Sequence, residues 1–152
     1  HGTNRRQRQM CIRDRYWVRD ILEKGHKWYS DQGKRGHKGP HSYSVSGRVK
    51  NPGVKVAPAG ITMNELLNDY CGGMQDGHKF FGYLPGGASG GILPADKADV
   101  PLDFGTLEEL GCFIGSGAIV VFSDKDSIKS VVLNLLKFFN DESCGQCTPC
   151  RV

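Results

Sequence analysis

The stretch SYSVSGRVKNPGVKVAP, residues 42–58, predicts a β-hairpin and with it the fold class. Its first half alternates with a period of two, which places four residues on one face of a half-buried strand: Tyr43, Val45, Gly47 and Val49. The segment KNPG (50–53) supplies a turn, because Pro52 fixes φ at its corner and Gly53 is free to adopt a positive φ. VKVAP (54–58) alternates again and completes the hairpin.

A short helix is expected after the hairpin. Thr62 offers an N-cap with Glu65 three residues later, which is the pattern of a capping box. Apolar residues follow at helical spacing: Met63, Leu66, Leu67 and Tyr70. The pair Gly72–Gly73 then ends the helix.

Further strands are expected at KFFGYLP (79–85) and GAIVVFS (117–123), with one helical turn at TLEEL (106–110). A hairpin, a helix and then more strands is the order of a β-grasp (ubiquitin-like) unit, a small sheet that holds one helix. The predicted fold class is therefore α+β. We place this unit at residues 41–124.

The N-terminal part of the chain divides into an arm, a helix and a linker. Residues 1–15 carry five arginines and one acid, and the 15 basic and 15 acidic side chains that remain cancel. This arm resembles a translated sequencing adapter, so we expect it to be non-native and expect no nucleic-acid binding. Residues 16–29 predict a short helix that ends near Lys24, and the glycine-rich stretch 30–41 predicts a linker.

A last helix is expected after Ser123, with Asp126 completing a second capping box. Its apolar residues form a wide stripe: Ile128, Val131, Val132, Leu135, Leu136, Phe138 and Phe139. Such a stripe needs more partner surface than one small sheet offers. We therefore expect residues 125–152 to begin a separate helical domain. No apolar run is long enough to cross a membrane.

Three cysteines lie at intervals of three residues in ESCGQCTPCRV (142–152): Cys144, Cys147 and Cys150. The spacing C-x2-C-x2-C matches the start of the bacterial ferredoxin pattern, in which thiolates bind an iron–sulfur cluster. Gly145 permits close backbone approach and Pro149 stiffens the loop. The six cysteines lack a disulfide-like spacing, which favours a reducing compartment.

Three alternatives to an iron–sulfur site stay open at this point. The cysteines could be free surface thiols, although at this density they would be an oxidation liability. A zinc site needs a second short pair of ligands, and the histidines are unpaired and far upstream: His26, His37, His41 and His78. A redox-active disulfide of the thioredoxin type needs a βαβ context that this sequence does not suggest.

No motif nominates a catalytic residue. The glycine-rich stretch 82–94 has neither nucleotide fingerprint, so we interpret it as turns, and residues 111–118 as a close-packed bend. No Ser/His/Asp or Cys/His spacing suggests a nucleophile. Four carboxylates are expected to be solvated loop residues: Asp99, Asp103, Glu108 and Glu109.

Four segments in this order resemble one family: SVSGRVKNPGVKVAPAGIT (44–62), YLPGGASGGILP (83–94), VPLDFGTLEELGCFIGSGAIVV (100–121) and ESCGQCTPCR (142–151). It is the flavin- and NAD-binding iron–sulfur subunit of respiratory complex I, NAD-reducing hydrogenases and NAD-dependent formate dehydrogenases. The resemblance covers residues 16–152. GYLPGGASGGILPAD (82–96) and SDKDS (123–127) are most similar to the beta subunit of the formate dehydrogenase branch.

The resemblance implies a layout. An FMN- and NAD-binding domain lies upstream, with residues 16–40 as its last helix and a linker. Residues 41–124 are a β-grasp module of the soluble-ligand-binding type, and residues 125–152 begin a helical [4Fe-4S] domain. Cys144, Cys147 and Cys150 match the first three cluster ligands, the fourth lying beyond Val152, and the motifs for FMN and NAD are outside this chain.

The resemblance also implies a function: electron passage between an iron–sulfur chain and NAD through FMN, in a cytoplasmic NAD-dependent formate dehydrogenase. Expected partners are a [2Fe-2S] subunit and a molybdenum/iron–sulfur catalytic subunit. The alternatives are the corresponding complex I or hydrogenase subunit, or a non-catalytic β-grasp module that binds a ligand or partner. We expect this chain alone to catalyse nothing.

Overall fold

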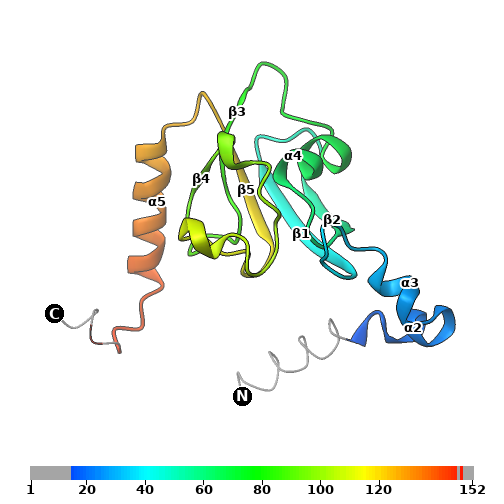
Figure 1. Ribbon diagram of the computed structural model, residues 1–152. Coiled ribbons are helices and arrows are strands. Elements are labelled where there is room, and N and C mark those ends of the chain that lie inside the picture. The colour runs from blue at the N-terminus through cyan, green and yellow to red at the C-terminus, as the bar shows by residue number, and fades with distance from the viewer. Residues whose placement is uncertain (1–14, 147, 149–152) are drawn as a thin grey trace.

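A computed structural model describes residues 15–146 and 148 of the chain, and it contains one five-stranded sheet with helices on and around it (Figure 1). The strands are β1 Pro40–Gly47, β2 Gly53–Pro58, β3 Phe80–Leu84, β4 Leu93–Pro94 and β5 Ala118–Ser123. The helices are α2 Val18–Lys24, α3 His26–Ser30, α4 Met63–Glu65 and α5 Ile128–Asp141, with a π-helical turn at Leu66–Tyr70 and 3-10 turns at Ala95–Lys97 and Glu108–Leu110.

The predicted hairpin is confirmed. Strands β1 and β2 pair antiparallel from Pro40 opposite Pro58 to Val45 opposite Gly53. Tyr43 and Val45 of β1 are buried, as their period-two spacing predicts.

Strand β2 turns its two valines away from the core. Ala57 is buried, whereas Val54 and Val56 are 69% and 51% exposed. Alternation along the strand requires this, since a face that buries residue 57 must expose residues 54 and 56. The valine content of the sequence alone suggests the opposite face.

The sheet has the order β2-β1-β5-β3-β4. The first strand, β1, runs parallel to the last, β5, and the pairs β5–β3 and β3–β4 are antiparallel. Strand β4 was not predicted, because it has only two residues and lies inside the glycine-rich stretch. This arrangement is a mixed α/β fold.

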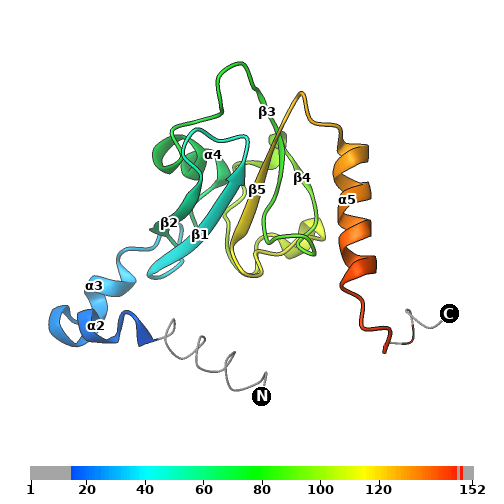
Figure 2. The ribbon, with the colours of Figure 1, turned by 180° about the vertical axis from the view of Figure 1, so that it is seen from behind.

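The predicted capping box is confirmed at the start of α4. Glu65 N donates to Thr62 Oγ1 at 3.3 Å, and Thr62 N donates to Glu65 Oε2 at 3.0 Å. The helix then widens into the π-helical turn, in which Cys71 N donates to Leu66 O. Its apolar residues Met63, Leu66 and Leu67 are buried in the core, so α4 is held by packing on one face of the sheet (Figures 1 and 2).

The N-terminal helix ends at Lys24 as predicted, and Gly25 breaks it with a φ of 88°. The stretch that follows is not a free linker throughout. Lys34 N donates to Ala59 O at 2.8 Å, and Ala59 N donates to Gly39 O at 2.9 Å. Residues 34–39 are thus hydrogen-bonded to the sheet unit, ahead of the boundary expected at residue 41.

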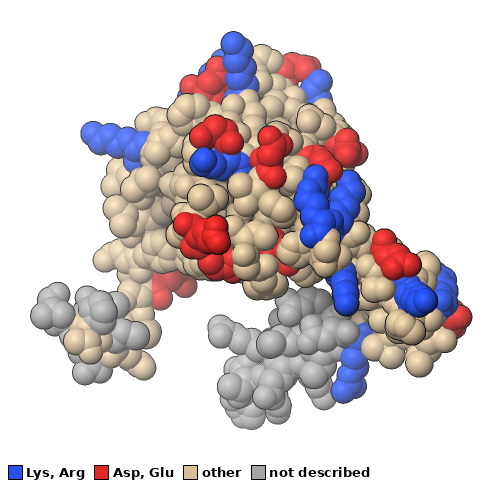
Figure 3. All heavy atoms as spheres, in the orientation of Figure 1, with Lys and Arg blue, Asp and Glu red and all other residues tan. Residues whose placement is uncertain are grey.

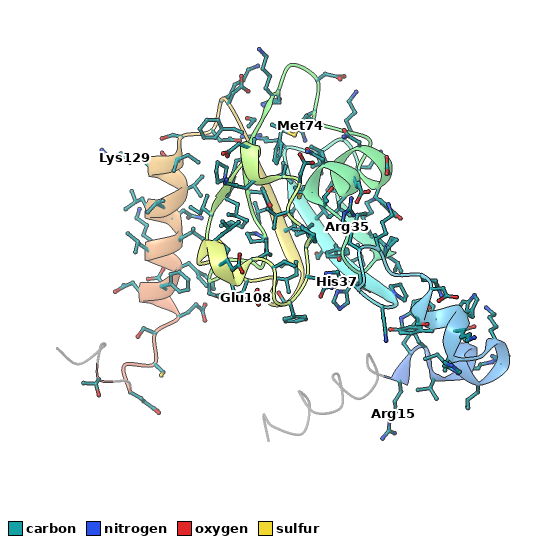
Figure 4. The ribbon with its side chains drawn as sticks, in the orientation of Figure 1. Arg15, Arg35, His37, Met74, Glu108 and Lys129 are labelled. Atoms are coloured by element: carbon teal, nitrogen blue, oxygen red, sulfur yellow. The ribbon has the colours of Figure 1, made fainter. Side chains whose placement is uncertain are left out.

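The side chain of Arg35 strengthens this attachment. Its Nη1 donates to Gly60 O at 3.0 Å and to Glu65 Oε2 at 2.9 Å, and Lys34 Nζ lies 3.1 Å from the same carboxylate. Figure 4 shows Arg35 close to the helical part of the 60–70 region. The hydrogen bond from Arg35 is the main reason why the pKa of Glu65 falls to about 2.

We expect Gly47→Ala to destabilise the fold more than Gly73→Ala. Both glycines have a positive φ, 92° and 84°, which costs a non-glycine residue about 1–2 kcal/mol. A Cβ at Gly47 would also lie 2.2 Å from Val121 O, whereas nothing lies within 4 Å of a Cβ at Gly73. The free energy of unfolding in urea should therefore fall by a further ~1–3 kcal/mol in Gly47→Ala. If the two variants lost the same free energy of unfolding, the close contact between β1 and β5 at Gly47 would contribute nothing to stability.

We expect Glu65→Gln to remove part of the acid sensitivity of the fold. The pKa of Glu65 is about 2 in the folded protein against an ordinary 4.5, so the unfolded chain takes up the proton first. The stabilisation is complete above pH 4.5 and is lost as the pH falls toward 2. Glutamine keeps the capping box but not the charge. Urea unfolding measured between pH 4.5 and 2 should show a smaller loss of unfolding free energy in Glu65→Gln than in the unsubstituted chain. If both proteins lost the same free energy over this range, Glu65 would not be a source of the acid sensitivity.

Candidate functional site

The helix that leads to the cysteines begins later than predicted. Helix α5 starts at Ile128, and its N-cap is Ser127, whose Oγ accepts from Ser130 N at 3.4 Å. The capping box predicted for Ser123 and Asp126 is wrong, because both residues precede the helix. The Asp126 side chain does accept hydrogen bonds from Ser123, but these stabilise the turn before the helix and do not cap the helix.

Asp126 holds the turn between β5 and α5 with five hydrogen bonds. Its Oδ2 accepts from Ser123 N at 2.9 Å and from Ser123 Oγ at 3.0 Å, and Oδ1 accepts from Arg48 Nη2 at 2.8 Å. Arg48 Nε donates to both carboxylate oxygens, at 3.2 Å each. The hydrogen bonds from Arg48 and then from Ser123 hold the pKa of Asp126 well below its usual range. The carboxylate therefore stays ionised and fixes where the chain leaves the sheet.

His78 completes a His–Ser–Asp contact in space that the sequence did not suggest. Its Nδ1 lies 3.0 Å from Ser123 Oγ, which in turn donates to Asp126. In a hydrolytic triad the histidine stands between the other two and the serine faces substrate. Here the serine stands in the middle and is 0% exposed, so the group is structural.

The apolar stripe of α5 is largely uncovered by the described residues. Four of its seven residues are exposed, as is the neighbouring Leu133, and the other three are partly buried. The exposed residues of the stripe are Val132, Leu136, Phe138 and Phe139. Figures 1 and 2 show α5 standing beside the β4 side of the sheet rather than across a face. The exposed stripe fits the expectation that this helix packs on something other than the sheet. That expectation stays a prediction.

Of the three predicted cluster ligands, only Cys144 lies within the described residues; Cys147 and Cys150 lie outside them. Cys144 is exposed and follows α5 by three residues. Gly145 next to it has a φ of 65° with nothing within 4 Å of a Cβ position, and its N–H donates to Ser143 Oγ at 3.3 Å. A thiol on an open turn can ligate a cluster, and the left-handed glycine redirects the chain there.

The other described cysteines do not suit a metal. Cys71 and Cys112 are buried, and burial raises the pKa of each thiol, which disfavours the thiolate that a metal needs. Over residues 15–146 and 148, no group of three or more His, Cys, Asp or Glu residues is placed to hold a metal ion. A cluster held by this chain would therefore depend on the segment after α5.

The glycine-rich stretches are close-packed turns, as predicted. A Cβ at Gly86 would lie 2.2 Å from Phe113 O, so residues 82–94 and 111–118 pack backbone to backbone. Gly111 ends the 3-10 turn Glu108–Leu110 in the left-handed conformation, again as predicted for TLEEL.

One carboxylate expected to be solvated is buried. Asp103 is 7% exposed, its Oδ2 lies 2.9 Å from His37 Nδ1, and its Oδ1 accepts from Phe104 N. No local pattern indicates this pair, because its members come from distant loops. Glu108 and Glu109 are exposed as expected, and Asp99 accepts from Asn64 Nδ2 at 2.7 Å.

The surface seen in Figure 3 mixes charges of both signs over the sheet unit. Within the described ranges, no helix is both long and apolar enough to cross a membrane.

We expect Asp126→Asn to loosen the β5–α5 turn. The variant loses the charge that Arg48 and Ser123 surround, at a cost of about 1–2 kcal/mol after allowance for the exposure of Arg48. Amide hydrogen exchange of residues 123–130 should become faster. Asp124→Asn is the matched control, since Asp124 accepts from Lys79 N but makes no contact with Arg48. Equal exchange in the two variants would argue against the role of Asp126.

Comparison with known proteins supports the predicted family. Residues 130–152 match the model of the NADH-ubiquinone oxidoreductase-F iron-sulfur binding region. This match contains all three cysteines.

Curated relatives extend the similarity over most of the chain. The F subunit of NADH-quinone oxidoreductase of Escherichia coli (strain K12) is 41% identical over 131 residues, which are 86% of this chain and 29% of the relative. The F 2 subunit of the same kind of enzyme in Rhizobium meliloti (strain 1021) is 36% identical over 134 residues, 88% of this chain and 32% of the relative. The chain thus spans about a third of the length of the relatives it matches.

A solved structure has the same fold. An NAD+-reducing [NiFe]-hydrogenase in the H2-reduced state aligns with a TM-score of 0.72 and 28% identity, over 87% of this chain and 22% of that chain. Together with the sequence matches, this shows that most of the chain is similar in sequence to the F subunits of NADH-quinone oxidoreductases and shares its fold with the hydrogenase chain.

Proposed function

We propose that this chain is part of an electron-transfer subunit in which Cys144, Cys147 and Cys150 bind a [4Fe-4S] cluster. The observation that carries the proposal is the coincidence of two features. The iron-sulfur binding region of the family matches residues 130–152, and the described cysteine within it, Cys144, is exposed on an open turn.

The chain's own residues would hold and position the group. Cys144 supplies a thiolate, Gly145 turns the backbone beside it, and the Asp126 network sets the start of the helix that carries them. When bound, the cluster would accept and donate single electrons. A fourth ligand from beyond Val152 would complete the site.

The domain layout belongs to the same proposal. Residues 16–40 close an FMN- and NAD-binding domain, residues 41–124 form a β-grasp module, and residues 125–152 begin the helical cluster domain. The β-grasp assignment is supported by the strand order, with the first and last strands parallel in the middle of the sheet and one helix held on it. In the parent protein, FMN and NAD would bind outside this chain, which alone would catalyse neither hydride nor electron transfer.

We further propose that the parent enzyme is an NAD-dependent formate dehydrogenase. The support is the resemblance of GYLPGGASGGILPAD (82–96) and SDKDS (123–127) to that branch. Its partners would be a [2Fe-2S] subunit and a molybdenum/iron–sulfur subunit. The names of the relatives keep a quinone oxidoreductase and an NAD-reducing hydrogenase as alternatives. NAD reduction by formate or by hydrogen, and NADH oxidation by a quinone, assayed on the purified parent complex, distinguish the three.

The cluster proposal predicts about four irons and four acid-labile sulfides per parent chain after anaerobic purification. Cys144→Ala should abolish or strongly reduce both, because one thiolate of the site is lost. Cys112→Ala is the matched control: it removes a buried thiol and should leave the iron content unchanged. Zinc without sulfide would instead support a structural zinc site, and an unchanged iron content in Cys144→Ala would refute the ligand assignment.

A further inference from the structure

A cleft of about 470 Å³ lies where the N-terminal helices meet the sheet unit. Four segments of the chain line it: the N-terminal helices, through Trp17 at the start of α2 and Tyr29 in α3; the start of β1; the loop at Phe104; and the loop 114–117 that precedes β5. The size lies within the range of small-molecule pockets, ~300–1,000 Å³. None of the residues in the proposed cluster site takes part.

Two pairs of rings contribute to its walls. The rings of Trp17 and Tyr29 lie 6.2 Å apart with an interplanar angle of 57°, and those of His41 and Phe104 lie 6.3 Å apart at 71°. Both distances are in the range of favourable aromatic pairs. Aromatic rings therefore make up a large part of the lining, beside Pro40 and Ile114.

The rings are held in place from behind. The ring of Tyr29 packs so closely on Gly39 that a Cβ there would lie 2.4 Å from it. His41 meets the buried ring of Tyr43 edge to face at 5.9 Å and 87°, and Tyr43 OH donates to Leu102 O at 3.1 Å. These contacts hold Tyr29 and His41 in place before any ligand arrives, which lowers the entropic cost of filling the cleft.

The lining combines these rings with polar groups. It includes the hydroxyls of Ser42 and Ser116, the imidazole of His41 and the backbone of Gly115 and Gly117. Among the described residues that line the cleft, none is Lys, Arg, Asp or Glu. A phosphate or carboxylate placed there would lose hydration without a charged partner. An uncharged ligand with hydrogen-bonding edges would lose little hydration free energy on entering the cleft.

Phe104 gives a further indication of a missing contact. Its side chain is 61% exposed although the loop that carries it is anchored, because Phe104 N donates to the buried carboxylate of Asp103 at 2.7 Å. A large ring kept at a pocket mouth by a fixed backbone gains most when another planar group stacks on it.

We infer that this cleft binds an uncharged planar heteroaromatic ring of purine size or smaller, stacked on Phe104, with its polar edge facing Ser42 and Ser116. Where the ring is the base of a larger molecule, the charged part of that molecule lies outside the cleft. This inference does not depend on the cluster proposal, so either can fail without the other.

Adenine is the probe for this inference, added to the whole 152-residue chain and followed by the backbone amide resonances in NMR spectra. Saturable shifts are expected at residues 41–43 and 115–117. Phe104→Ala should weaken binding about tenfold or more, the effect of removing one stacking ring. Phe81→Ala is the matched control, since Phe81 is 48% exposed on β3 and does not line the cleft. It should leave the affinity unchanged.

Cyclohexanecarboxamide, which is polar and uncharged but not planar, should produce no saturable shift at these amides. The inference is overturned if adenine produces none either, if the two compounds bind alike, or if Phe104→Ala binds adenine as tightly as Phe81→Ala. Thermal melts of both variants, expected to match the unsubstituted chain because both side chains are exposed, separate lost binding from lost folding.

Discussion

The parallel pairing of β1 with β5 is the constraint on which the rest of the structure depends. It joins the first strand of the hairpin to the last strand of the sheet, from Ser44 opposite Ala118 to Gly47 opposite Val121. The contact is close enough that only glycine fits at residue 47. Closing the chain over this distance costs conformational entropy, and the burial of the core cluster that contains Tyr43 and Ile119 offsets that cost.

The same pairing positions the C-terminal helix. Arg48 directly follows β1, and its N–H donates to Val121 O, so its side chain emerges beside the end of β5. There it meets Asp126 and closes the turn from which α5 starts. A residue of the first hairpin therefore helps to fix the turn that leads into α5, the helix that Cys144 follows. The cleft at the other end of β1 depends on the same strand through His41 and Tyr43.

Local patterns in the sequence predicted most of the elements. The hairpin 42–58, the capping box of Thr62 and Glu65 and the apolar stripe of α5 each involve residues close in sequence, so their physics is readable from spacing. The predictions that failed all involve contacts between residues or strands that are not adjacent in the sequence. Asp126 is recruited by Arg48, which lies 78 positions away, and so does not cap α5. Asp103 is buried by His37. Strand β4 exists only because β3 lies beside it.

In the candidate site, too, the local pattern was predictable from the sequence and the long-range packing was not. The cysteine spacing nominates Cys144, Cys147 and Cys150 without any structure, since ligand spacing is a local property. That Cys144 is accessible while Cys71 and Cys112 are not could not be read from their types, because burial is decided by the whole sheet. Nor did any pattern indicate the cleft, as its rings come from separate segments of the chain.

The outward valines of β2 have a consequence for how this chain behaves with its neighbours. Strand β2 is the outermost strand on its side, and one of its long edges has no ladder partner among the described residues. Val54 and Val56 expose an apolar face beside that free edge, while Lys55 and Pro58 lie in the same short strand. Backbone groups along a free edge can pair with a strand of another molecule, and a lysine and a proline in the strand both oppose such pairing.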